Sequence, residues 1–188
     1  STGANTIGTV TTNAVAGVAT FSDVGISGTA ATAYTLTFTS GSLTTAAQTI
    51  TPTFGTATQA TLSTPAAGST SGLAFTTQPI ITIKDAAGNT VTNSTAAVTM
   101  TVSTGATTLG TATVTAVAGV ATFSDVGISG TSGASYTLTF TSGSLSTAAQ
   151  TITPTFGVAT RATLTTSANG SASGSAFTTQ PIITIKDT

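Results

Sequence analysis

Residues suited to binding a cation lie in the segment Asp85-Ala86-Ala87-Gly88-Asn89, and Asp187 begins a second copy of it. Calcium takes about six to eight oxygen ligands, usually from several carboxylates. The chain has four aspartates and no glutamate, so this segment offers too few ligands. We therefore predict that Asp85 and Asn89 stabilise a turn, and we predict no metal site.

Lys84 and Lys186 raise the question of an amide bond between a lysine amine and a nearby Asn or Asp side chain. That reaction needs the lysine inside the fold. Alternation along the strand that contains Ile81 and Ile83 places both isoleucines inward and Lys84 outward. We expect a solvated lysine. The alternative predicts a mass lower by one water or one ammonia for each bond.

Catalysis has little support in the residue types present. The chain contains no His, Cys or Glu, and its Ser, Thr, Asp and Lys residues recur at repeated positions, so no nucleophile and base can be paired. The glycines have no strand-to-helix context that would form a phosphate loop. We predict no catalytic residue, no cofactor and no enzymatic activity. Asp23 and Asp125 each follow an Ala-Thr-Phe-Ser segment and are expected to brace a bend.

Two segments match the acceptor pattern for N-linked sugar, Asn93-Ser94-Thr95 and Asn169-Gly170-Ser171. The many Thr and Ser residues are also candidates for O-linked sugar. Short patterns of this kind arise often by chance in a chain rich in Ser and Thr, so modification and its absence both stay open.

An internal repeat organises all of these positions. Residues 14–29 recur without change at 116–131, an offset of 102 residues, and residues 1–86 are identical to 103–188 at 68 of 86 positions. A period near 100 residues exceeds that of solenoid repeats and is close to the size of one small domain. The substitutions gather in small, polar, Gly-containing stretches, which are expected to be loops.

Charge is nearly absent, which restricts the classes of partner. Three Lys or Arg residues cannot form the basic face that nucleic acid requires, and no apolar run is long enough to span a membrane. We predict no nucleic-acid partner and no membrane insertion. A net charge of −1 removes the repulsion between copies and favours self-association. There is no cysteine, and a repeat of this size can fold without disulfides.

Strand periodicity accounts for most of each repeat. The segments Tyr34–Thr39 and Val98–Val102 alternate large apolar residues with threonine, and Ile80–Ile83 is also strand-like. Residues 10–21 predict two strands joined at Ala16-Gly17 as a hairpin, whereas residues 56–72 are linker-like. About seven strands per repeat and no helical period indicate an all-β fold of tandem immunoglobulin-like antiparallel β-sandwiches. Pro52 and Pro154 are expected at a strand end or an edge.

Three motifs carry a family resemblance. They are Asp85-Ala86-Ala87-Gly88-Asn89 after the isoleucine-rich strand, Gly119-Val120-Ala121-Thr122-Phe123, and Tyr136-Thr137-Leu138-Thr139-Phe140. In this order they resemble the bacterial Ig-like domains of the invasin and intimin group. The resemblance implies a rod of Ig-like modules on a prokaryotic cell surface, in which most modules are spacers and binding sits in a separate terminal domain.

Family boundaries predict three parts. Residues 1–57 would be the later part of one Ig-like repeat, 58–157 a complete repeat, and 158–188 the beginning of the next. Strand exchange between the ends of two copies is one possibility, but the counterparts of Ala87–Val102 are absent from the last part. We therefore expect the chain to continue beyond Thr188.

The sequence as a whole predicts a structural protein. Our leading hypothesis is an Ig-like tandem-repeat module of a long extracellular filament, stalk or sheath on the cell surface, whose partners are copies of itself in tandem or lateral assembly. The alternative is an adhesin segment that binds a host ligand, a surface glycan or a solid surface through its threonine-rich faces. Flat arrays of Thr would favour the adhesin, and twisted faces broken by loops would favour the spacer.

Overall fold

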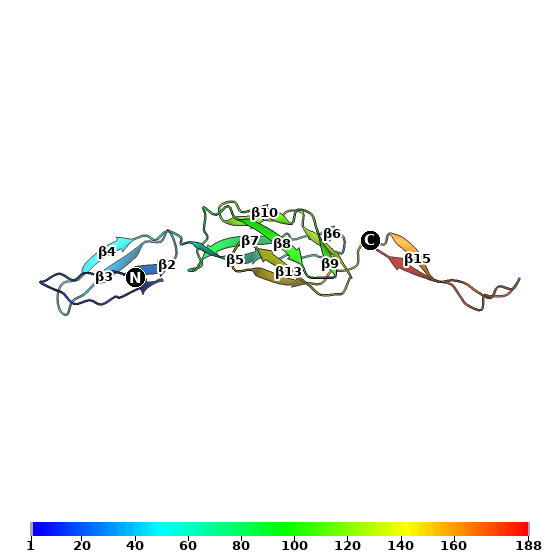
Figure 1. The fold of residues 1–188 in the computed structure, drawn as a ribbon, viewed down its shortest axis with the longest axis horizontal. Coiled ribbons are helices and arrows are strands. Elements are labelled where there is room, and N and C mark those ends of the chain that lie inside the picture. Colours follow the sequence, from blue (N-terminus) through cyan, green and yellow to red (C-terminus); the bar gives the residue numbers. More distant parts are fainter. Residues whose placement is uncertain (1, 188) are drawn as a thin grey trace.

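The computed structural model describes residues 2–187 and places them in three successive parts along one long axis (Figure 1). These are an N-terminal half-module (residues 2–56), a central module (57–157) and a C-terminal hairpin (158–187). Every regular element among the described residues is a β-strand, which confirms the predicted all-β fold of antiparallel sandwich type. In residues 2–187 there is thus no helix with the length and apolar character needed to cross a bilayer.

The N-terminal half-module consists of two antiparallel strand pairs. Strand β1 (Ala4–Ile7) pairs with β2 (Gly25–Gly28), and β3 (Tyr34–Phe38) pairs with β4 (Ala46–Ile50). The C-terminal hairpin contains a single pair, β15 (Arg161–Thr166) and β16 (Ile182–Lys186). The two strand pairs of the half-module enclose only part of a core, and the hairpin has no second layer, so many apolar side chains of both parts are exposed.

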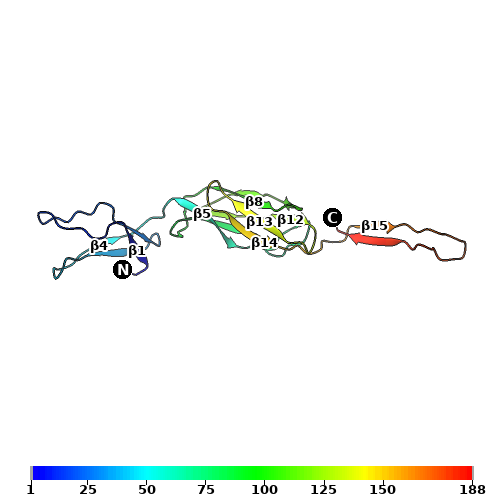
Figure 2. The same ribbon diagram turned by 60° about the horizontal axis from the view of Figure 1, so that its bottom comes forward.

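The central module has ten strands, which form three sheets around one core (Figures 1 and 2). They are β5 (Ala57–Thr64), β6 (Leu73–Ala74), β7 (Ile80–Asp85), β8 (Ala97–Val102), β9 (Ala106–Leu109), β10 (Thr113–Thr115), β11 (Val120–Thr122), β12 (Gly127–Gly130), β13 (Tyr136–Thr141) and β14 (Ala148–Ile152). The sheets have the orders β10-β8-β13-β14, β11-β7-β5 and β6-β12-β9. The count exceeds the predicted seven because turns divide several extended segments into short strands.

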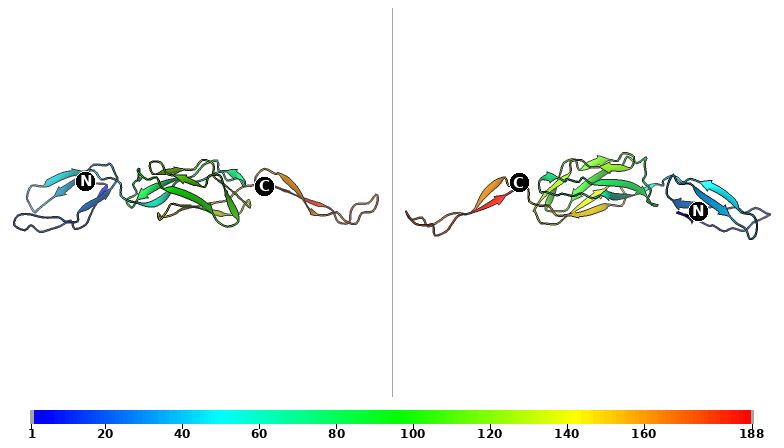
Figure 3. Two further views of the ribbon diagram at one scale, coloured as in Figure 1. Left: turned by 45° about the horizontal axis from the view of Figure 1, so that its top comes forward. Right: turned by 180° about the vertical axis from the view of Figure 1, so that it is seen from behind.

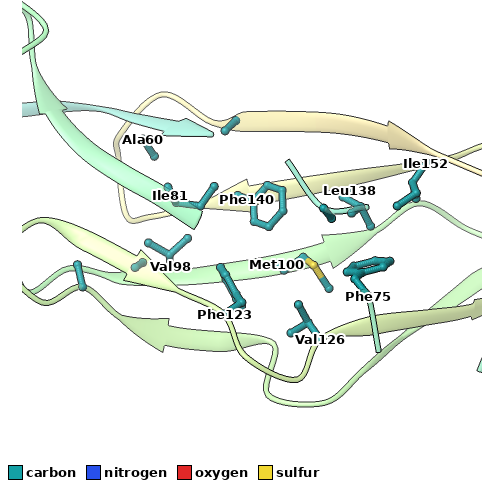
Figure 4. Packing of buried hydrophobic residues seen from close by; sticks show 14 of the residues in the cluster. Ala60, Phe75, Ile81, Val98, Met100, Phe123, Val126, Leu138, Phe140 and Ile152 are labelled. Atoms are coloured by element: carbon teal, nitrogen blue, oxygen red, sulfur yellow. The ribbon is translucent and has the colours of Figure 1, made fainter. Parts of the chain in front are cut away.

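The core of the central module follows from alternation in its strands. In β13 the side chains of Tyr136, Leu138 and Phe140 are buried, while the threonines between them face outward. Figure 4 shows how Phe123 and Phe140 lie among aliphatic side chains from facing strands. The fully buried large side chains are Phe123, Phe140, Ile81, Ile83, Met100, Ile128, Leu138, Val98, Val126, Pro79 and Pro154.

The predicted turn at Ala16-Gly17 is confirmed, since Val15 and Val18 exchange two backbone hydrogen bonds (2.9 and 3.0 Å), but the segments that it joins do not continue as a hairpin. In the central module their counterparts are β10 and β11, and β10 pairs with β8 whereas β11 pairs with β7 in another sheet. The turn at Ala118-Gly119, with φ of 50° and 78°, therefore carries the chain from one layer to the other. A local turn signal cannot distinguish a hairpin from such a crossover, because the choice depends on which distant strands offer free edges.

The linker-like prediction for residues 56–72 is wrong for residues 57–64, which form β5, whereas residues 65–72 contain no strand beyond isolated bridges. Strand β5 begins at Ala57, runs for eight residues and pairs with β7 over most of its length. Its small side chains gave a weak apolar signal, yet Ala60 is buried and belongs to the core cluster of the central module. Tertiary pairing thus decides the structure of this segment.

Pro52 and Pro154 lie at positions where no backbone N–H is needed for a strand ladder. Pro52 follows the end of β4, and Pro154 follows the end of β14, as predicted for a residue that cannot donate to a strand ladder. Residues 51–56 form the connection between the half-module and the central module, which Figure 3 shows from two further sides. The short connection places the turn after β7 close to the preceding half-module.

Candidate functional site at the joint between modules

The Asp85 carboxylate is the centre of the joint between the N-terminal half-module and the central module. Its side chain is only 3% exposed. Oδ1 accepts hydrogen bonds from the backbone N–H groups of Ala87 (3.0 Å) and Asn89 (2.8 Å). Oδ2 accepts from the N–H of Gly55 (2.7 Å) and from Nδ2 of Asn89 (3.1 Å). The turn-stabilising role predicted for Asp85 agrees with this geometry, and one of the bonds also reaches the connection between the two parts.

Asn89 extends the same network into the half-module. Its Nδ2 donates to the carbonyl oxygen of Gly28 (3.1 Å), and its Oδ1 accepts from the N–H of Ala30 (2.8 Å). Both partners lie about 60 residues earlier in the chain, at the end of β2. One amide side chain therefore satisfies backbone groups of the preceding half-module while it is anchored to Asp85 of the central module.

A further contact lies within the half-module, just before the joint. The N–H of Ala31 donates to the carbonyl oxygen of Pro52 (2.8 Å), which ties the loop after β2 to the connection. Ala31 adopts a φ of 62°, a conformation that costs a non-glycine residue free energy and that the surrounding contacts must stabilise. The two parts are joined by the hydrogen bonds of Asp85 with Gly55 and of Asn89 with Gly28 and Ala30.

The hydrogen-bonded groups around Asp85 have a structural role. Four N–H donors occupy both oxygens of Asp85, and a cation would have to displace them. No group of three or more potential metal-binding side chains occurs among residues 2–187. Burial raises the pKa of Asp85, but the hydrogen bonds from Gly55, Asn89 and Ala87 together outweigh it and hold the pKa below its ordinary value of 3.8.

We expect this lowered pKa to make the stability of the central module depend on acid. Above the pKa of the unfolded chain Asp85 is charged in both states, and its hydrogen bonds contribute fully to stability. As the pH falls from there through the folded-state pKa, the unfolded chain takes up the proton first and this contribution is lost. Urea unfolding between about pH 5 and about pH 2 should show the loss, and Asp85→Asn should remove this component of the pH dependence.

The second joint repeats the first contact. The N–H of Gly157 donates to Oδ2 of Asp187 (2.7 Å), which matches the bond from Gly55 to Asp85 at the 102-residue offset. The two bonds span the same sequence separation of 30 residues. The hydrogen bond from the connection to the Asp side chain of the following part therefore recurs with the repeat.

The other residues considered for chemistry lie apart from the joint network. Asp23 accepts bonds at both oxygens from the N–H and hydroxyl of Thr9, and Asp125 does so from Thr111, so each braces a bend as predicted. Lys84 is half-buried, whereas Ile81 and Ile83 beside it in β7 are fully buried, and Lys186 is exposed.

Both acceptor sites for N-linked sugar are accessible. Asn93 is exposed in the turn before β8, and Asn169 is exposed in the loop between β15 and β16. The N–H of Gly170 donates to Oδ1 of Asn169 (2.8 Å), which holds that side chain against its own backbone. Access alone distinguishes neither modification nor its absence.

The sequence predicted the turn at Asp85 and Asn89 but not the backbone groups to which these side chains are hydrogen-bonded. Gly28, Ala30 and Gly55 contribute backbone groups, and no side-chain type marks them. One available signal was that Gly28 and Gly55 recur at Gly130 and Gly157 in the next repeat. A Cβ at Gly55 would stand about 3.5 Å from the Asp85 carboxylate, which is ordinary contact, so this glycine is not required by space alone.

Comparisons with known proteins give limited information. No family model and no curated protein matches the chain. Among solved structures it is similar to Parabacteroides merdae β-glucuronidase, in one crystal structure and in a second with glycerol in the active site, each at 16% identity and a TM-score of 0.41. The matches cover 58% and 59% of this chain and only 15% and 14% of those chains. A likeness of this size indicates neither activity nor substrate.

Proposed function

We propose that the chain is a structural, Ig-like repeat module of a long extracellular filament, stalk or sheath on a cell surface. The observation that carries the proposal is the double role of Asn89, whose amide bonds to Gly28 and Ala30 of one part and to Asp85 of the next. A spacer needs joints of fixed geometry, because free joints would let a tandem array collapse into a coil.

The mechanism is mechanical. Tension along the axis acts on the connection at residues 51–56, where the bond from Gly55 to Asp85 and the bonds of Asn89 with Gly28 and Ala30 resist separation. Within the central module, the tension acts on the backbone hydrogen bonds between paired strands. The near-neutral surface lets copies lie side by side without repulsion.

The test replaces Asn89 with alanine. We expect the free energy of unfolding of the central module to change little, because Asp85 keeps three backbone donors. The two parts should, however, lose their common orientation. Residual dipolar couplings measured on both parts should fit one alignment tensor in the parent chain and need two tensors in Asn89→Ala.

The matched control is Asn93→Ala, which removes an exposed amide four residues away in the same module. It should leave the single tensor intact. If Asn89→Ala also kept a single tensor, the joint would be rigid for another reason and the role proposed for Asn89 would be rejected.

A second candidate function, the adhesin segment, is favoured by one feature of the four-stranded sheet. Its register aligns Thr113 with Thr99 and Thr99 with Thr141 across three strands, and Thr101 with Thr139 beside them. These residues form a neutral hydroxyl and methyl face on the outside of the module. Saturable binding of the chain to a glycan array or a solid surface, abolished by Thr101→Lys, would support this function over the spacer.

A further inference from the structure

The first and the last segment of the central module lie side by side and run in the same direction. The entry segment (residues 57–71) contains β5 and the loop after it, and the exit segment (residues 146–155) contains β14 and the chain after it. Isolated parallel bridges join the two segments near both of their ends, Gln59 with Ser146 and Thr70 with Thr155. The two places where the chain enters and leaves the module are therefore connected directly to each other.

Backbone hydrogen bonds cross between the two segments at both ends. At the start, the N–H of Ala60 donates to the carbonyl oxygen of Ser146 (3.2 Å), and the N–H of Ser146 donates to the carbonyl oxygen of Thr58 (3.1 Å). At the other end, Thr155 exchanges two backbone hydrogen bonds of 2.9 and 3.0 Å with the entry segment. The segments are thus fixed to each other along most of their length.

Between these two ends, the side chain of Gln150 connects the segments. The N–H of Ala66 donates to Oε1 of Gln150 (2.8 Å), and Nε2 of Gln150 donates to the carbonyl oxygen of Ala66 (2.6 Å). Ala66 is only 4% exposed, so water has little access to its backbone groups if the amide is removed. The loss of Gln150 would therefore leave a buried donor and a buried acceptor without partners.

The direction of tension loads this connection in shear. The strands of the central module run roughly along the long axis, and the chain enters the module at one end and leaves it at the other (Figures 1 and 2). Tension at residues 56 and 158 therefore pulls the entry and exit segments in opposite directions along their own length. Segments loaded in this way must slide past each other, so the hydrogen bonds between them have to break together. Segments that are peeled apart from one end lose the same bonds one after another, at a lower force.

We propose that the entry and exit segments form a mechanical clamp, which sets the force at which the central module unfolds. The clamp consists of the backbone bonds at Ser146 and Thr155 and the side-chain bonds of Gln150. The inference deepens the proposed mechanical function and rests on it, because only a module under tension uses a clamp. It involves neither joint, since all of these bonds lie within residues 57–157.

The direction of pulling tests the clamp without altering its residues. Because the chain has no cysteine, handles for optical tweezers can be attached at Thr56→Cys and Val158→Cys, which load the clamp in shear. A second pair, Thr56→Cys and Ser144→Cys, uses an exposed residue just before Ser146 and peels the segments apart from one end. At one constant force, unfolding should be at least about tenfold slower in the shear geometry. Equal rates in the two geometries would overturn the proposal.

A pair of glutamine variants tests the role of Gln150. In the shear geometry, Gln150→Ala should raise the rate of unfolding at constant force at least about tenfold, because the clamp loses two bonds and Ala66 keeps unpaired groups. The matched control is Gln78→Ala. The amide of Gln78 bonds to the N–H and the carbonyl oxygen of the buried Val126 (both 3.0 Å) and to the carbonyl oxygen of Phe75 (2.8 Å). These bonds join internal segments outside the clamp.

Urea unfolding of both variants separates the clamp from general stability. Gln78→Ala and Gln150→Ala should lower the free energy of unfolding to a similar extent, but Gln78→Ala should leave the rate of forced unfolding nearly unchanged, because its bonds are still intact when the clamp breaks. If both variants accelerated forced unfolding equally, the rate would follow overall stability and the clamp would be rejected. Neither measurement loads the joints, so the test of Asn89→Ala succeeds or fails independently.

Discussion

Replacing Phe140 with alanine should lower the free energy of unfolding of the central module by about 3–5 kcal/mol. Phe140 is fully buried in β13, and its ring lies 5.7 Å from that of Phe123 at an interplanar angle of 60°. Truncation removes this tilted contact and leaves a cavity between two sheets that are held by separate ladders and cannot close on it. Urea unfolding followed by tyrosine fluorescence or circular dichroism would measure the loss.

The repeat supplies the matched control, Phe38→Ala. Phe38 occupies the same position in an identical Tyr-Thr-Leu-Thr-Phe segment, but it is 36% exposed, because residues 2–56 contain only part of the cluster that encloses Phe140. We expect a loss of less than half that of Phe140→Ala. Equal losses at the two positions would show that Phe38 is covered in solution and would contradict its exposure in the structure.

Replacing Asp85 with alanine is expected to have the second largest effect, a loss of about 2–3 kcal/mol in the free energy of unfolding. The change removes a buried carboxylate and leaves the N–H groups of Gly55, Ala87 and Asn89 without their acceptor. Water can reach some of these donors at the exposed rim of the turn, which keeps the loss below the sum of the separate bonds. Chemical unfolding at neutral pH would measure it.

The change Asp85→Ala should also loosen the joint, because the side chain of Asn89 loses its anchor at Asp85. The control is Asp125→Ala, which removes an exposed carboxylate with two bonds to Thr111 inside a single module. It should cost less stability and leave the relative orientation of the two parts unchanged. An Asp125→Ala effect as large as that of Asp85→Ala would mean that burial at the joint adds nothing.

Strands with strict alternation were the most predictable elements. Tyr136–Thr141 and Val98–Val102 place large apolar residues at every second position, and a sheet with one covered face has the same period. The turn at Asp85 and Asn89 was predictable as well, since Gly88 with a φ of 85° and two Asx side chains are local signals. These predictions needed no knowledge of distant residues.

The errors concern pairing over long separations. Residues 56–72 lacked a strong apolar period, yet β5 forms in residues 57–64 because it pairs with β7. The expected hairpin at Ala16-Gly17 corresponds to a crossover between sheets in the complete module. The joint depends on backbone groups of Gly28 and Ala30, and side-chain type cannot mark a backbone contact.

The amino-acid sequence by itself determined the repeat, the all-β class and the faces of the best strands, because these depend on intervals between neighbouring residues. Only the tertiary structure decided which of two identical segments is buried, which glycines and alanines hold the joint, and which strand edges stay free. The physical reason is that burial and ladder pairing belong to pairs of segments. Phe38 and Phe140 have the same local sequence and different surroundings, since only Phe140 is enclosed by a complete core cluster.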